Sequence, residues 1–295
     1  FYDVLSLSWL ARQFRRTIAH PISERIDAVL TRALKREVLI ANPMQRERPS
    51  LLVWVVGGAL VIALAVLGVQ AAGLLATLPA GEWARIGIGL LSTFLRVTVS
   101  LIIATAWTIP VGVWIGSNRR VAAVLQPIVQ VVASIPATAL FPVIVLALVN
   151  VTGGLNVAAV LLMLLGTQWY LLFNVIAGAS AIPQDLTYTT ELLQVKGWAR
   201  WRTLILPALF PYLITGMITA GGGAWNASIV AEHIQFGGET LTTTGVGALI
   251  AEGTATGNYA LLLASTLSLI TAVVAINRFF WRRLYAIAEE KYRME

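Results

Sequence analysis

Residues 121–184, VAAVLQPIVQVVASIPATALFPVIVLALVNVTGGLNVAAVLLMLLGTQWYLLFNVIAGASAIPQ, contain no Asp, Glu, Lys or Arg. A charged side chain at the centre of a membrane-spanning helix costs roughly 2.5–3.5 kcal/mol, so such a stretch is typical of membrane spans. It is too long for one span of about 20 residues. The turn-rich pentad NVTGG at 150–154 divides it. The stretch therefore predicts two consecutive spans, at about 124–149 and 155–179.

Four further blocks lack charged residues and are long enough to span a membrane: Pro49–Gly81, Val97–Asn118, Thr203–Ala231 and Gly253–Asn277. Only 12% of the chain is charged, about half the share of a soluble domain. The sequence thus predicts an all-α membrane protein with a transmembrane domain at 51–285. Its six transmembrane helices are expected at about 51–75, 97–116, 124–149, 155–179, 208–231 and 258–280.

The Lys and Arg residues give the predicted orientation. With six spans, 19 of the 21 fall before the first span, in the second and fourth loops, or after the last span. The positive-inside rule places these segments, and both termini, in the cytoplasm. The loop Glu232–Gly257 contains no Lys or Arg and is expected outside. We expect a multi-pass protein of a bacterial cytoplasmic (inner) membrane.

The two ends of the chain are expected to be cytoplasmic. In residues 1–50, Leu10, Phe14 and Ile18 recur at helical spacing beside arginines. This pattern predicts an amphipathic helix on anionic membrane lipids; the alternative is a linker from an upstream transmembrane half. The chain begins at Phe1 rather than Met, which fits a processed, trimmed or partial chain. Residues 286–295 form the predicted tail.

Several kinds of chemistry have no candidate residues. The chain has no Cys and two distant His residues, so no metal cluster is predicted. It has no Gly-x-x-x-x-Gly-Lys-Ser/Thr loop for a nucleotide. The net charge of +7 comes from Lys and Arg residues clustered between the apolar blocks. This distribution is better explained by membrane topology than by nucleic-acid binding. Arg96 and Glu232 lie at predicted span ends, where the plainest interpretation is a charge at the membrane interface. We expect a non-enzymatic subunit whose transport is driven by a separate motor protein that supplies the energy.

Residues 181–202, between the fourth and fifth spans, are the predicted point of contact with that motor. Pro183 suits the first turn of a helix, and Asp185 complements the helix dipole. Gly197 is the predicted stop. The sequence therefore predicts a short cytoplasmic helix followed by an interfacial segment rich in Trp and Arg.

This loop resembles the EAA loop of ABC-importer permease subunits, Glu-Ala-Ala-x3-Gly-x9-Ile-x-Leu-Pro. Anchoring on Leu204–Pro207 puts Tyr188–Thr190 at Glu-Ala-Ala and Gln194 at the glycine. Starting instead from Glu191 and Gly197 leaves the segment to Pro207 three residues short. The flanking segments resemble nitrate/sulfonate/bicarbonate-type anion permeases, particularly their duplicated form. These segments are Pro110–Gly116, Gln126–Gln130, Gly197–Pro211 and Gly222–Glu232.

The resemblance implies a type I ABC-importer transmembrane domain that forms half of a pathway for a small solute, and the resemblance to anion permeases implies that this solute is an anion. Its implied partners are ATP-binding cassette subunits, a second permease half (fused or separate), and a periplasmic or lipid-anchored solute-binding protein. ATP and Mg would be bound by the partner ATPase subunits, with no cofactor in this chain. The residues that would couple to the ATPase are Asp185, Thr189, Thr190, Glu191, Gln194, Lys196, Gly197 and Trp198.

A translocation pathway is expected where the spans are irregular. The third span contains Pro127, Pro136 and Pro142, and proline kinks or breaks a helix. The fifth contains the triple glycine 221–223 followed by polar and aromatic residues. The alternative for both features is helix packing alone. The pathway candidates are Pro136, Thr138, Trp225, Asn226, Ser228 and Glu232.

Two other classes of protein are kept as alternatives. A secondary carrier or channel would work without ATP, but coupling charges and an inverted repeat are not evident. A membrane-embedded enzyme would need a clustered nucleophile, acid–base pair or metal set. The residues alone do not identify a substrate.

Overall fold

The computed structural model describes residues 51–236 and 239–292. The predictions for residues 1–50 therefore lie outside the described residues, as does the end of the predicted tail. The chain divides into two units, residues 1–65 and 66–295, and each is described by itself. In the first, the described residues form the beginning of α4 (Leu51–Ala76), an apolar helix long enough to cross a membrane.

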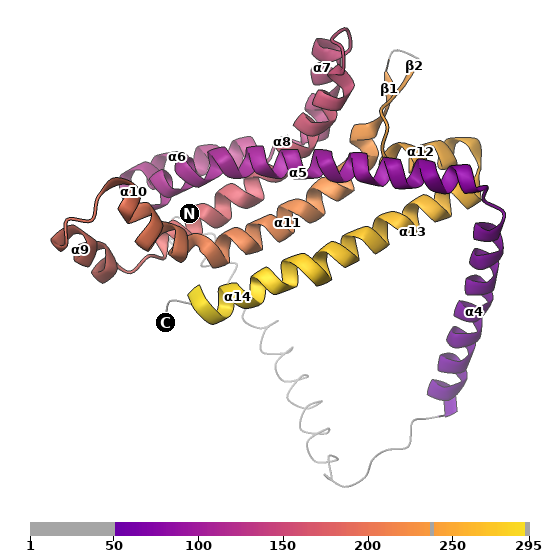
Figure 1. Ribbon diagram of the computed structural model, residues 1–295, viewed down its shortest axis with the longest axis horizontal. Coiled ribbons are helices and arrows are strands. Elements are labelled where there is room, and N and C mark those ends of the chain that lie inside the picture. The colour runs from indigo at the N-terminus through magenta and orange to yellow at the C-terminus, as the bar shows by residue number, and fades with distance from the viewer. Residues whose placement is uncertain (1–50, 237–238, 293–295) are drawn as a thin grey trace, which may run out of the picture. The chain divides into compact units, whose positions relative to one another are not determined.

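Three long helices form the centre of the second unit: α5 (Ala80–Gly116), α8 (Gly154–Ser180) and α11 (Leu206–Glu232). Helix α8 packs along both α5 and α11 (Figure 1). Small residues make these approaches close. A Cβ atom at Gly112 of α5 would lie 2.6 Å from Val175 Cγ1, and one at Gly178 of α8 would lie 2.8 Å from the ring of Tyr212.

The predicted third span is broken. Helices α6 (Arg119–Ala133) and α7 (Ala137–Leu148) meet at an angle of 74°. Pro136 lies at the break, whereas Pro127 and Pro142 lie inside the helices. The expectation of a broken helix is confirmed, but only one of the three prolines lies at the break, where it precedes the first residue of α7.

The last span continues well beyond its apolar part. Helix α13 (Tyr259–Ile276) runs into a π-helical turn, η3 (Asn277–Trp281), and then into α14 (Arg282–Tyr292), which packs against α11. Five of the described helices are long and apolar enough to cross a membrane, and six spans result when the bent pair is counted as one. The predicted all-α membrane architecture is confirmed, and the bent pair counted as one span gives the six that were predicted.

Two details differ from prediction. Helix α5 begins at Ala80 rather than at 97, so Arg85 and Arg96 lie within a helix. The segment after α11 was expected to be a loop. It instead forms an antiparallel hairpin, β1 (His233–Phe236) and β2 (Glu239–Thr242), followed by α12 (Val246–Thr256).

Candidate functional site

The segment between α8 and α11 contains two short helices, α9 (Gln184–Leu192) and α10 (Gly197–Arg200). Pro183 is the N-cap of α9, and Asp185 lies in the first turn. There the carboxylate complements the positive end of the helix dipole. The predicted short helix in this loop is confirmed. A π-helical turn, η2 (Trp201–Ile205), then joins α10 to α11.

The end of α9 differs from prediction. The Gln194 N–H donates to the Glu191 carbonyl at 3.0 Å, and the Val195 N–H donates to the Thr190 carbonyl at 2.8 Å. This pair of bonds is the Schellman motif, in which the residue after the C-cap adopts a left-handed conformation and is usually glycine. Here that residue is Gln194, with φ 54°, the one non-glycine residue with positive φ among residues 51–236 and 239–292.

Gly197 was predicted to stop α9, and that prediction is wrong. It has φ 58° and begins α10. The stop is Gln194, the residue that the alignment anchored on Leu204–Pro207 places at the family's glycine. A conformation that favours glycine at this position supports that alignment over the one starting from Glu191.

The coupling candidates therefore share one short segment. Asp185, Thr189, Thr190 and Glu191 lie on α9, Gln194 and Lys196 lie in the turn, and Gly197 and Trp198 lie on α10. Apolar side chains at the end of α9 point to solvent, with Leu192 84% and Leu193 70% exposed. An exposed pair of leucines, the last residue of a nine-residue helix and its C-cap, suits contact with another protein. The coupling role itself stays a prediction.

At the opposite end of the bundle, Arg96 and Glu232 form a buried ion pair. Arg96 Nη1 lies 2.6 Å from Glu232 Oε1, and the two residues are only 8% and 1% exposed. Thr93 donates its hydroxyl to the same carboxylate oxygen at 2.7 Å. The Gly247 N–H, in the first turn of α12, donates to Oε2 at 2.9 Å. The carboxylate thus joins α5 and α11 and caps α12.

The second terminal nitrogen of the Arg96 guanidinium, Nη2, binds the segment after the hairpin. Arg96 Nη2 donates to Asn156 Oδ1 at 2.6 Å, and to the Thr243 hydroxyl and the Thr244 carbonyl at 2.7 Å each. Asn156 lies in the first turn of α8. We call Thr93, Arg96, Asn156, Glu232 and Thr243 the charged hub. It connects α5, α8, α11 and α12 through two buried charges.

The interpretation of Arg96 and Glu232 as interfacial charges is wrong. They lie 136 positions apart in the sequence and find each other inside the protein. The sequence offered one clue: each is an ionisable residue beside an apolar block, and such residues in membrane proteins usually pair and face the interior.

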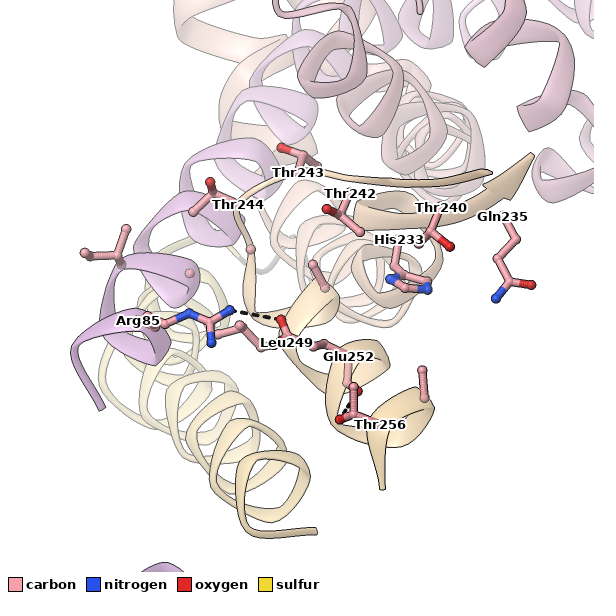
Figure 2. Close-up of a pocket in the computed structure, with 15 residues that line it drawn as sticks. Arg85, His233, Gln235, Thr240, Thr242, Thr243, Thr244, Leu249, Glu252 and Thr256 are labelled. Atoms are coloured by element: carbon pink, nitrogen blue, oxygen red, sulfur yellow. Dashed lines mark hydrogen bonds and ion pairs between the residues drawn. The ribbon is translucent and has the colours of Figure 1, made fainter. Parts of the chain in front are cut away.

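A pocket of about 630 Å³ lies beside the charged hub (Figure 2). Threonines of the hairpin segment, His233 and Gln235 line one side, and Ala248, Leu249 and Glu252 of α12 line another. Arg85 of α5 donates to Glu252 at 2.9 Å across this pocket, and it also pairs with Glu82. Polar and apolar side chains both line the pocket, and most of them come from the segment predicted to face outside.

The structure only partly groups the six pathway candidates. Trp225 and Ser228 are buried in the core, and the Ser228 hydroxyl donates to the Trp225 carbonyl at 2.7 Å. Glu232 belongs to the charged hub. By contrast, the candidates Asn226, Pro136 and Thr138 are exposed: Asn226 lies on α11, Pro136 at the break, and Thr138 in the first turn of α7. Their role in a pathway stays a prediction. Among the described residues there is no group of three His, Cys, Asp or Glu that could hold a metal.

Comparison with known proteins decides the family. Residues 108–292 match the family described as "Binding-protein-dependent transport system inner membrane component". The chain belongs to this family. The match begins within α5 and includes the broken helix pair, the α9–α10 loop, the hairpin and the last span.

Individual relatives support the resemblance to anion permeases. The chain is 28% identical over 149 residues to the nitrate import permease protein NrtB of Synechocystis sp., covering 50% of this chain and 53% of the relative. It is 30% identical over 147 residues to the bicarbonate transport system permease protein CmpB of Synechococcus elongatus, covering 50% and 51%. A putative aliphatic sulfonates transport permease protein SsuC of Bacillus subtilis is 24% identical over 155 residues, covering 52% of each chain. The chain matches about half the length of these relatives.

Proposed function

We propose that this chain is the membrane-spanning permease subunit of an ATP-driven importer, and that it forms half of the pathway for a small anion. Family membership is the observation that carries the proposal, because the family is named for transport that depends on a binding protein. The nitrate, bicarbonate and sulfonate relatives support an anion as the substrate.

Helix α9 is the proposed contact with the ATPase subunit. It is short, its two terminal leucines are exposed, and it lies between two spans. A motor that pushes on α9 would move α8 and α11 together, since α9 connects them and the two helices pack along each other. ATP and Mg would be bound by the ATPase subunits, and this chain would be non-catalytic.

The hairpin, α12 and the neighbouring pocket are the proposed docking side for a periplasmic or lipid-anchored solute-binding protein. The hub fixes this segment to the middle of α5, the start of α8 and the end of α11. Docking there would therefore reach all three central helices. A second permease half, fused or separate, would complete the pathway in the bacterial inner membrane, with both termini in the cytoplasm.

Reconstitution tests the function. The protein is purified with its ATPase and binding-protein partners, placed in liposomes, and supplied with labelled nitrate, bicarbonate or an alkanesulfonate. We expect uptake of one of these anions that requires ATP inside and binding protein outside. Uptake that continues without ATP would instead identify a secondary carrier or channel.

The orientation has its own test. Thr240 of the hairpin and Ala199 of α10 are both exposed, and the chain has no native Cys. In intact cells, we expect a membrane-impermeant thiol reagent to label Thr240→Cys and to leave Ala199→Cys unlabelled. The reverse labelling would overturn the proposed orientation.

A further inference from the structure

The last span ends in a groove that carries two arginines. Ile218 of α11 and Val274 of α13 form its apolar part. Asn277, Arg278, Arg282 and Tyr285 form its polar part, and the volume is about 410 Å³. The π-helical turn η3 contains Asn277 and Arg278, and α14 contains Arg282 and Tyr285. The groove is thus apolar at one end and cationic at the other.

These arginines have no counter-ion in the described part of the chain. No ion pair or hydrogen bond joins Arg278 or Arg282 to any residue of 51–236 or 239–292. The residues three and four positions after Arg282 are Tyr285 and Ala286, so the helix supplies no carboxylate at pairing distance. By contrast, Arg85 and Arg96 on α5 both contact carboxylates. Two adjacent guanidinium groups in one groove favour an anion from outside the chain.

The position along the span indicates which anion. Helix α13 carries no charged residue, and Arg278 is the first charge after it. The change from apolar to charged residues marks the level of the lipid headgroups. Phe279 and Phe280 beside it are exposed, and Trp281 follows, as is typical of a helix segment in contact with the interface. Anionic lipids are concentrated on the cytoplasmic side, where basic pockets between helices bind their headgroups.

We propose that this groove binds an anionic phospholipid. The phosphate group lies between Arg278 and Arg282 and accepts hydrogen bonds from both guanidinium groups. The Asn277 amide and the Tyr285 hydroxyl supply further donors, and an acyl chain lies against Val274 and Ile218. Because α14 packs on α11, the lipid joins the last span to the helix that follows the α9–α10 loop.

Lipid retention by the full-length purified protein tests the proposal. The protein is equilibrated in detergent with equal amounts of phosphatidylglycerol and phosphatidylcholine, and bound lipid is counted by native mass spectrometry. We expect phosphatidylglycerol to be retained in preference. Each arginine near an anionic surface contributes about a fivefold effect. Arg278→Gln should therefore lower retention about fivefold, and Arg278→Gln with Arg282→Gln roughly 30-fold.

Arg283 is the matched control, because it is an exposed arginine of α14 outside the groove. Arg283→Gln removes the same charge and should lower retention less than twofold. Equal losses in the Arg278→Gln and Arg283→Gln variants would mean diffuse attraction and would overturn the site. Arg278→Lys with Arg282→Lys keeps the charge and should retain more lipid than the Gln pair, which separates binding from misfolding.

A free anion is the competing occupant. Inorganic phosphate at millimolar concentration should leave phosphatidylglycerol bound, because it lacks acyl chains for the apolar part of the groove. Displacement of the lipid by phosphate, or equal retention of the two lipids, would overturn the proposal.

Discussion

The charged hub and the α9–α10 loop lie at opposite ends of α8 and α11 and are built in opposite ways. In the hub, two charges are buried and bound by groups from four helices and the segment after the hairpin. In the loop, a nine-residue helix exposes two leucines and ends in a left-handed glutamine. The hub holds α5, α8, α11 and α12 in one arrangement, because separating them would leave a buried charge without its partner. The loop has few internal contacts and leaves its apolar groups for a partner.

The difference predicts opposite responses to mutation. Changes in the hub should reduce the stability of the transmembrane domain itself. Changes in the loop should leave that stability intact and alter what binds there.

The largest expected effect is at Arg96. Arg96→Met leaves the Glu232 carboxylate buried without its cation, and breaking a buried pair in this way costs roughly 3–5 kcal/mol. We expect low yield and a clearly lowered thermal unfolding midpoint in detergent. Adding Glu232→Gln should recover much of the loss, because it removes the unpaired charge: the amide oxygen can accept from the Gly247 N–H, and the amide NH2 can donate to the Thr93 hydroxyl. A double variant as unstable as Arg96→Met alone would show that the charge pair is not the source of the stability.

The second effect concerns binding at α9. Leu192→Asp with Leu193→Asp should weaken association with the ATPase subunit about 30-fold or more, since a residue at the centre of an interface contributes about 2 kcal/mol. Both side chains are exposed, so the unfolding midpoint should stay within the small range of surface substitutions. Co-purification and ATPase stimulation measure the association.

Ala199→Asp is the matched control, because Ala199 is exposed on α10 but lies outside α9. Ala199→Asp should change neither the association with the ATPase subunit nor the unfolding midpoint. Normal ATPase association in the double leucine variant would remove α9 as the contact.

The charged hub and the α9–α10 loop also differ in how much of their structure can be predicted from the sequence. The start of α9 followed from Pro183 and Asp185, since proline and an acidic residue act within one helical turn. The six spans followed from charge-free blocks for a similar reason. The free-energy cost of placing a charged side chain in the membrane depends on that residue and not on distant ones. The hub could not be predicted because its two charges come from α5 and α11, and a single sequence does not record which distant residues meet.

The single break in the third span shows the same limit, whereas the hairpin had a local signal. Three prolines predicted a broken helix, but only packing determines that the chain bends at Pro136 and stays helical around Pro127 and Pro142. The segment 233–242 contains two threonines and places two glycines between short alternating runs, a local pattern typical of a hairpin turn that the expectation of a loop missed. Its place is fixed by Thr243 and Thr244, whose oxygens contact Arg96.

The smallest effect separates two explanations for the end of α9. A non-glycine residue in the left-handed conformation costs roughly 1 kcal/mol or more. Gln194→Gly should therefore stabilise the Schellman turn by up to about 1 kcal/mol, part of which is lost to the greater freedom of glycine in the unfolded chain. Up to about fivefold slower amide hydrogen exchange at the C-terminal end of α9 is the expected readout. Gln194→Val should speed exchange, because a β-branched side chain tolerates positive φ poorly.

Lys196→Gly makes this test specific. Lys196 is also exposed and lies two residues away, but its φ of −123° is ordinary extended backbone. Glycine there relieves no strain and only increases the entropy lost on folding, so exchange in α9 should stay the same or become faster. If Lys196→Gly slowed exchange as much as Gln194→Gly, the effect would come from chain flexibility and not from the left-handed residue. A gain confined to Gln194 would identify this position as the stop of the helix and the counterpart of the family's glycine.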